Sequence, residues 1–299
     1  MCLIVINRDK VIELFYDMDN FVKEMQVCLV DAKPKTGPAG CMSTFEMMAI
    51  TALYHFSGMK CFKFYYAHFI KGVLRGYFPD APCYQRFVAI KHRCVPWLAA
   101  FMCLLRLGEP TGTYFGDSTK LPVCHNKRAK RNKVFKGLAK SGKSSTGWFF
   151  GFKLHLIVNQ FGQIVKFLLT PGNVADNNQD LLHSLFSGLK GECYLDKGYL
   201  TSLFEELLEK GLKLITPIRD NMKNQLVCMR EKLNLRKRGI IETVNGMLKE
   251  VLDICHTRHR KPENFLANLM GALVAYTYLE NKPVAKVNEN QDEIKIVLI

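Results

Sequence analysis

The stretch Thr113-Tyr114-Phe115-Gly116-Asp117-Ser118-Thr119 places a carboxylate near the end of a run of residues that favour strands. We predict a strand at residues 111–118. Two apolar runs follow at 152–158 and 163–170, and the turn-forming sequence Asn159-Gln160-Phe161-Gly162 joins them. This part of the chain therefore predicts three strands, of which the last two form a hairpin.

Helices and strands alternate after the hairpin. The periodicity predicts helices at 177–189, 201–210, 238–252 and 263–280, and strands at 192–196 and 212–218. Thr201 or Ser202 is expected to cap the second of these helices, and Gly211 to end it. The order resembles that of the ribonuclease-H-like fold, an α/β fold in which helices flank a mixed sheet, here of five strands.

The chain before this region is mainly helical in pattern. Apolar residues recur at helical spacing in residues 11–30 and 42–66. We therefore divide the chain into a mainly helical domain at 1–108, a ribonuclease-H-like α/β domain at 109–285 and a C-terminal tail at 286–299.

Composition narrows the class of protein. Hydrophobic residues make up 48% of the 299 residues, which is enough for a packed core. The net charge of +15 points to a polyanionic partner, with a basic protein that has no nucleic-acid role as the alternative. Eleven scattered cysteines without a Cys-x-x-Cys pair are typical of reduced thiols. Residues 265–279 are fewer than the roughly 20 that a membrane span needs, so we expect a soluble, cytoplasmic protein without a membrane partner.

Three carboxylates stand in contexts that suit a metal site. Asp117 and Asp196 each close a predicted strand, and Glu242 lies on the helix predicted at 238–252. One aspartate at a strand end is often only a turn residue. Three such carboxylates in a basic chain point to an enzyme that binds two Mg²⁺ ions. These ions can activate an oxygen nucleophile and stabilise the leaving oxygen of a phosphodiester.

The helix around Glu242 has two distinct stripes. Its polar stripe comprises Arg238, Glu242, Asn245 and Lys249. Its apolar stripe comprises Ile241, Val244, Leu248 and Val251. Taken alone, this pattern is also that of a surface helix with ion pairs four residues apart. The two aspartates and the order of elements favour the functional interpretation.

A basic segment follows Asp117. No Asp or Glu occurs between Ser118 and Ala175, and the segment favours phosphate binding over a merely solvated face. The residues that we expect to contact DNA there are Lys120, Lys127, Arg128, Lys130, Arg131 and Lys133. The run Gly137–Ser144 fits the nucleotide-binding pattern G-x-x-x-x-G-K-[ST], but no strand precedes it and no helix is predicted after it, so a P-loop is the weaker interpretation.

Several short motifs together resemble bacterial insertion-sequence transposases of the DDE class, most closely the insertion-sequence 982 family. They are Gly116-Asp117-Ser118-Thr119, Gly151-Phe152-Lys153-Leu154-His155, Thr170-Pro171-Gly172-Asn173-Val174-Ala175-Asp176, Asp196-Lys197-Gly198-Tyr199 and Thr216-Pro217-Ile218-Arg219. The family signature Y-x2-R-x3-E-x6-K is matched at Arg238, Glu242 and Lys249, whereas Leu235 replaces its tyrosine.

The resemblance implies that Asp117, Asp196 and Glu242 are catalytic and bind two Mg²⁺ ions, with Mn²⁺ as a substitute. It implies cleavage at terminal inverted repeats and joining of the 3′ ends to target DNA, by a dimer or larger assembly in the bacterial cytoplasm at the nucleoid. It also implies that 1–108 is a DNA-binding domain that recognises the inverted repeats and that 109–285 is the catalytic domain. The DNA contacts expected on the helix are Arg238, Asn245 and Lys249. Asp176 is expected to cap the helix that follows it and not to bind metal. A catalytically inactive DNA-binding relative and a P-loop nucleotidase are the alternatives.

Overall fold

The computed structural model describes residues 8–28, 42–145, 147–199, 202–217, 226–255, 259–287 and 296–298. Contacts within the chain define two compact units, Met1–Arg106 with Leu248–Leu279, and Leu107–Met247 with Glu280–Ile299. The sequence predicts one continuous domain over 109–285. The structure differs there, because the helix α10 (Pro262–Thr277) is buried along most of its length against helices of the first unit.

The first unit is helical, as the sequence predicts. Besides α10 it contains α1 (Arg8–Cys28), α2 (Thr44–Phe56), α3 (Phe62–Tyr65), the π-helix η1 (Tyr66–Val73), α4 (Tyr84–Ile90), the 3₁₀-helix η2 (Lys91–Cys94), α5 (Val95–Phe101) and the π-helix η3 (Met102–Arg106). Ser43 caps α2, and the Glu46 side chain returns to the Ser43 backbone in a capping box. By length and composition alone, Tyr84–Arg106 is apolar enough to cross a membrane, a test that core helices of soluble proteins also pass.

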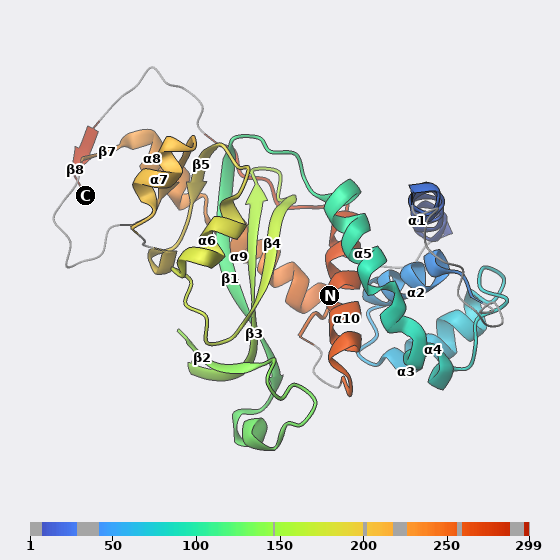
Figure 1. Cartoon of the computed structure of the whole chain (residues 1–299). Coiled ribbons are helices and arrows are strands. Elements are labelled where there is room, and N and C mark those ends of the chain that lie inside the picture. Colours follow the sequence, from blue (N-terminus) through green and yellow to red (C-terminus); the bar gives the residue numbers. More distant parts are fainter. Residues whose placement is uncertain are drawn as a thin grey trace. The chain divides into compact units, whose positions relative to one another are not determined.

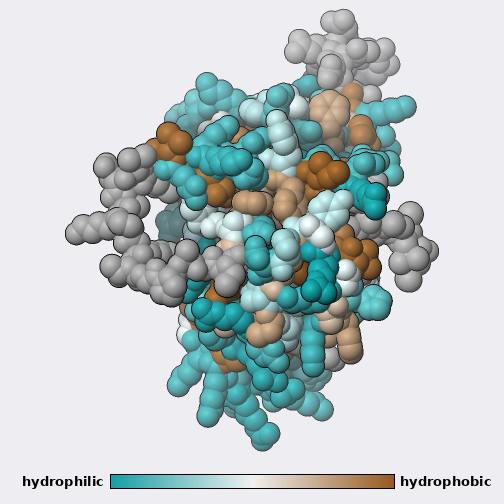
Figure 2. Space-filling model, turned by 90° about the vertical axis from the view of Figure 1, so that its right-hand side faces the viewer, coloured by the Kyte–Doolittle hydropathy of each residue, from teal (hydrophilic) through white to brown (hydrophobic). Residues whose placement is uncertain are grey.

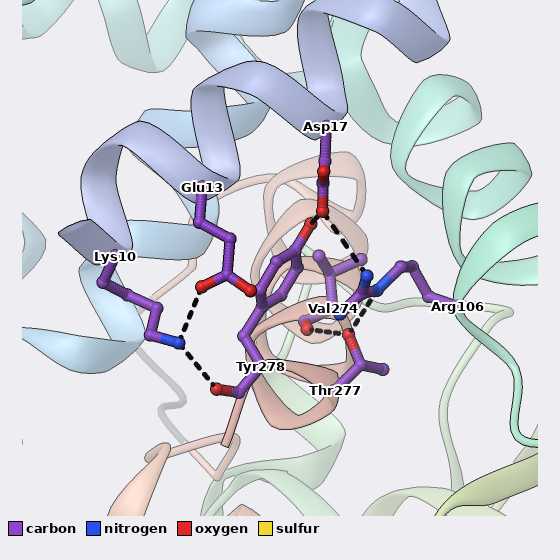
Figure 3. A network of polar contacts seen from close by, with 7 residues as sticks. All are labelled: Lys10, Glu13, Asp17, Arg106, Val274, Thr277 and Tyr278. Carbon is purple, nitrogen blue, oxygen red and sulfur yellow. Dashed lines mark hydrogen bonds and ion pairs between the residues drawn. The ribbon is translucent and has the colours of Figure 1, made fainter. Parts of the chain in front are cut away.

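A polar network ties α1 to η3 and to the end of α10 within this unit (Figure 3). The Tyr278 hydroxyl donates to Asp17 at 2.7 Å, and the Arg106 guanidinium carbon lies 3.9 Å from the centroid of the Tyr278 ring. Arg106 also donates to the Thr277 hydroxyl, and Lys10 donates to the Tyr278 carbonyl. This cation–π contact and its hydrogen bonds hold α1 in place beside α10.

The second unit is built on a six-stranded mixed sheet with the order β2-β3-β1-β5-β6, in which β4 also pairs with β3 (Figure 1). The strands are β1 (Thr113–Cys124), β2 (Lys140–Ser144), β3 (Gly147–Asn159), β4 (Ile164–Pro171), β5 (Gly191–Tyr194) and β6 (Leu212–Ile215). The pairs among β1 to β4 are antiparallel, whereas β5 is parallel to both β1 and β6. The predicted ribonuclease-H-like α/β fold is confirmed.

The predicted hairpin between β3 and β4 is also confirmed. Gly162 has a φ of +67°, and the Asn159 side chain accepts hydrogen bonds from the backbone N–H groups of Phe161 and Gln163 at 3.1 Å. The sequence analysis misses β2, which it assigns to the basic loop. Residues 140–144 carry no apolar alternation, and β2 forms because β3 offers it an edge to pair with.

Helices cover both faces of the sheet. The second unit contains η4 (Asn126–Arg131), α6 (Gln179–Phe186), η5 (Lys197–Tyr199), α7 (Phe204–Glu209), α8 (Met229–Arg236) and α9 (Gly239–Gly246), which continues as the π-helix η6 (Met247–Val251); β7 (Leu226–Cys228) and β8 (Ile296–Leu298) form a separate pair. Residues of α6 and α7 share a core with Tyr114 of β1. Asp117 lies three residues further along β1, faces the opposite way, and contacts α9.

Several local predictions need correction. Asn178, not Asp176, caps α6, because its side chain accepts a hydrogen bond from the Leu181 N–H at 3.0 Å. Leu203 precedes α7 without a side-chain cap, although Gly211 follows that helix at a φ of +89° as expected; Thr201 and Ile218 lie outside the described residues. Val251 is exposed, because the helix widens to π geometry at η6 and the predicted apolar stripe loses its register there. Every cysteine whose surroundings the structure describes is a free thiol, as predicted.

Candidate active site

Asp117 occupies a tightly packed position in the middle of β1. The preceding residue is Gly116, where a Cβ atom would lie 2.5 Å from Leu195 Cδ2 and 2.7 Å from Ile157 Cδ1. A larger residue at this position would require the ends of the Leu195 and Ile157 side chains to move, so Gly116 leaves room for the buried side chains that pack beside Asp117.

Parallel pairing brings Asp196 towards Asp117. Phe115 pairs with Tyr194, their rings stack with centroids 5.5 Å apart, and each aspartate follows two residues later. Side chains two residues apart on a strand point to the same face, so the pairing directs both carboxylates to one side of the sheet. Asp196 itself lies beyond the end of β5 and is exposed, and its carbonyl accepts a hydrogen bond from the Tyr199 N–H at 3.1 Å.

The electrostatics of Asp117 confirm that other charges are near. The pKa of Asp117 is raised to about 6, chiefly by burial and to a smaller extent by the negative charges of Asp196 and Asp176. A hydrogen bond with the Ser118 backbone and the positive charge of Arg238 act in the opposite direction. Asp117 is thus a carboxylate whose negative charge is held at an energetic cost, which a nearby cation reduces.

The helix α9 reaches this carboxylate through Asn245. The Asn245 Nδ2 donates to Asp117 Oδ2 at 3.3 Å, the residue is only 6% exposed, and its Oδ1 has no hydrogen-bond partner in the structure. A residue this buried is better placed to hold Asp117 than to contact DNA directly. The sequence analysis places Asn245 among the DNA contacts, so its position changes that interpretation.

Glu242 lies one helical turn before Asn245 and has a different environment. Its side chain is 60% exposed and accepts a hydrogen bond from Arg238 Nη2 at 2.9 Å. Within the described residues, no group of three or more His, Cys, Asp or Glu side chains is arranged to hold a metal ion. Two of the three predicted carboxylates are therefore brought together, while the third pairs with an arginine. Lys249 lies in η6 and belongs to the first unit.

Asp176 is the residue whose place the sequence analysis misjudged. It follows β4, and its carboxylate forms an ion pair with Lys153 of β3 at 3.1 Å. It also lies 4.0 Å from His155 and would be 3.6 Å from a Cβ atom on Gly198. One signal in the sequence could have found it, since Lys153 and His155 are polar residues within an otherwise apolar strand.

The basic segment forms an exposed surface on the second unit. Lys127, Arg128, Lys130 and Arg131 are exposed on η4, Lys133 follows them, and Lys120 is half-buried on β1. Figure 2 shows long hydrophilic side chains at the end of the unit that carries η4 in Figure 1. The nearby Trp148 is 65% exposed, whereas Phe149 is buried in the core.

The fold does not support the interpretation of Gly137–Ser144 as a P-loop. The C-terminal half of the run Gly137–Ser144 is the strand β2, and the next element is the strand β3. No helix N-terminus therefore faces this run, which the phosphate-binding mechanism requires.

Comparison with known families gives one match. The model of a family described as "Transposase DDE domain" matches residues 107–262, which is more than half of the chain and includes Asp117, Asp176, Asp196 and Glu242. A comparison with curated proteins gives no match.

Proposed function

The chain belongs to the transposase DDE-domain family, and from this premise we propose that it cuts DNA at the terminal inverted repeats of an insertion sequence and joins the 3′ ends to target DNA. The observation that carries the proposal is the pairing of β1 with β5, which directs Asp117 and Asp196 to one side of the sheet. Within the family, we propose a relationship to the insertion-sequence 982 group on the motifs given above.

We propose that Asp117, Asp196 and Glu242 hold two Mg²⁺ ions, with Mn²⁺ as a substitute. The donor set fits, because hard carboxylate oxygens are the ligands that Mg²⁺ prefers. The raised pKa of Asp117 and the unpartnered Oδ1 of Asn245 beside it are features that a cation would satisfy. When bound, the two ions would activate the attacking oxygen and stabilise the leaving one.

The protein's own residues have separable parts in this proposal. Asn245 keeps Asp117 oriented through its 3.3 Å hydrogen bond. Arg238 is a cation near Asp117, and it is also paired with Glu242 at 2.9 Å. Glu242 must therefore exchange Arg238 for metal when the site assembles, which its high exposure allows.

DNA would be held by the exposed cations of the second unit. Lysine and arginine side chains on η4 and beside it offer positive charge with no acid between Ser118 and Ala175 to neutralise it. Arg238 would add a contact near the carboxylates, and Lys249 of the first unit would add a further contact with DNA. We propose that the helical unit recognises the inverted repeats, that a dimer or larger assembly is active, and that the protein works at the nucleoid in the bacterial cytoplasm.

A catalytically inactive DNA-binding relative is the competing function, and one experiment separates the two. The purified protein is incubated with DNA that flanks its own gene, with Mg²⁺ or with EDTA. We expect footprints in both conditions and nicks at the element ends only with Mg²⁺. Footprints without nicks under any divalent cation would favour the inactive relative.

A further inference from the structure

A buried polar cluster lies behind the candidate site, on the sheet face that α6 and α7 cover. It consists of Lys153, His155, Thr170, Asp176 and Tyr199. The Lys153 ammonium donates to the Asp176 carboxylate at 3.1 Å and to the Val174 carbonyl at 3.0 Å. His155 is fully buried, with its ring nitrogens 3.0 Å from the Thr170 hydroxyl and 3.4 Å from the Tyr199 hydroxyl.

The cluster contacts β1, which carries Asp117, and the turn after β5, which contains Asp196. His155 pairs with Ser118, the residue after Asp117, across the β1–β3 ladder. The Tyr199 hydroxyl forms a hydrogen bond with the Ser118 side chain, and the Tyr199 N–H bonds back to Asp196. The cluster therefore connects β1 with the turn that follows β5. The distance between these two segments must stay constant if Asp117 and Asp196 are to bind the same metal ions.

Asp176 faces this turn directly, since a Cβ atom on Gly198 would lie 3.6 Å from its Oδ2. Its charge also acts on Asp117 and on Tyr199. A carboxylate beside two others raises the electrostatic cost of the site, and a partly buried ion pair such as Lys153–Asp176 is a weak source of stability compared with apolar packing. Such a group is better explained by the geometry that it imposes than by the stability that it adds.

We propose that Asp176, held by Lys153, is a positioning residue that fixes the turn Asp196–Tyr199 against β1 and so sets the spacing of Asp117 and Asp196. This inference rests on the proposed function, because the spacing matters only if the two aspartates share metal ions. It assigns to Asp176 neither a contact with DNA nor a place among the metal ligands. Partners that orient metal ligands in this way typically contribute about 10- to 100-fold to metal affinity or activity.

The test compares Asp176→Asn, Lys153→Met and the double variant with Asp180→Asn as the control. Asp180 is an exposed acid four residues further on, in the first turn of α6. Three quantities are measured: Mn²⁺ binding by electron paramagnetic resonance, the single-turnover nicking rate on the flanking DNA at rising Mn²⁺ concentration, and the Kd for that DNA.

We expect each single variant to weaken Mn²⁺ binding by about 10- to 100-fold while the Kd for DNA stays unchanged. Because the two residues act as one pair, the double variant should lose no more than either single variant. Asp180→Asn should match the wild type. Wild-type Mn²⁺ binding by Asp176→Asn would overturn the inference. Loss in Asp176→Asn with wild-type binding by Lys153→Met would also overturn it and make Asp176 a ligand.

Tyr199→Phe covers the case in which Asp176→Asn does not fold. It removes one hydroxyl and keeps the buried ring, so we expect a smaller loss of Mn²⁺ affinity at an unchanged Tm; unaltered affinity would contradict the proposal. Asp117→Asn separates this inference from the proposed function. If Asp117→Asn nicks normally, the function itself fails, whereas an inactive Asp117→Asn beside a normal Asp176→Asn removes only the positioning role.

Discussion

The two sides of the candidate site differ in how firmly they are held. On the sheet side, Asp117 lies in a paired strand and accepts a hydrogen bond from Asn245, and the strand register directs Asp196 beside it. On the helix side, Glu242 is 60% exposed and bonded to Arg238. The hydrogen bonds between paired strands fix the position and direction of a side chain such as that of Asp117. An exposed side chain near the start of a helix, such as that of Glu242, keeps its rotamer freedom.

The candidate site therefore has a prearranged half, on the sheet, and a half that must move, on the helix. A carboxylate that is already buried beside like charges destabilises the folded protein when it is ionised, and a bound cation would remove this cost. A carboxylate that is already paired with arginine must exchange one cation for another. The predictions below test each half, in order of decreasing effect.

The largest effect is expected on the sheet side. Asp117→Asn and Asp196→Asn should each lower Mg²⁺-dependent nicking of the flanking DNA by roughly 1000-fold. An amide lacks the negative charge that would hold the cation, and a bound cation would stabilise the transition state by several kcal/mol. DNA binding, measured by gel shift, should change little. Nicking within tenfold of the wild type by either variant would remove that residue from the ligand set.

The stability of the metal-free protein offers a second contrast. The pKa of Asp117 is raised to about 6 in the folded protein, so above that pH the folded state carries a charge that burial disfavours. Asp117→Asn should therefore raise the free energy of unfolding by about 1–2 kcal/mol at pH 7.5 in EDTA. The gain should shrink as the pH falls through about 6 and vanish only well below the unfolded pKa of about 3.9, where the folded and the unfolded carboxyl are both protonated.

Urea denaturation at several pH values measures this gain. Glu242→Gln is the matched control from the helix side, where an exposed residue should change stability by no more than about 0.5 kcal/mol. A destabilised Asp117→Asn at pH 7.5 would show that Asp117 is not an electrostatically strained carboxylate.

A smaller effect is expected at Lys249. If it holds a DNA phosphate, Lys249→Ala should weaken binding of element-end DNA and reduce the slope of log K against log salt by about one unit, with little change in Tm. Binding titrations at four salt concentrations give the slope. An unaltered slope together with normal strand transfer would remove Lys249 from the predicted DNA contacts.

The smallest effect is expected at Arg238. Removing it frees Glu242 and takes a positive charge away from Asp117, so Arg238→Ala should bind Mn²⁺ about two- to threefold more tightly without DNA, in line with the few tenths of a kcal/mol of an exposed helical ion pair. Calorimetry in the absence of DNA measures the affinity. Weaker Mn²⁺ binding would show that Arg238 supports the ligand set instead of competing with it.

The sequence predicted the sheet well wherever apolar residues alternate. The strands β1, β3, β4, β5 and β6 all show this pattern, but β2 is rich in lysine and serine and depends on its partner strand. The helix α8 was missed for a related reason, because its residues are mostly polar and carry no strong periodicity.

The candidate site was only partly predictable from the sequence. Motif spacing identified Asp117, Asp196 and Glu242 as candidates, but Asp176 was interpreted as a helix cap because its neighbours are turn residues. Its ion pair with Lys153 joins residues 23 positions apart, and only the β3–β4 pairing brings them together. The exposure of Val251 likewise follows from a π-helical turn that periodicity does not reveal.

We propose that Glu242 joins the two aspartates as a metal ligand, although the structure pairs it with Arg238. The most direct measurement is Mg²⁺-dependent nicking of the flanking DNA by Glu242→Gln, beside the exposed control Glu250→Gln in η6. We predict that Glu242→Gln binds this DNA normally and does not nick it, while Glu250→Gln nicks at the wild-type rate. Wild-type nicking by Glu242→Gln would contradict the account and return Glu242 to an ordinary surface ion pair.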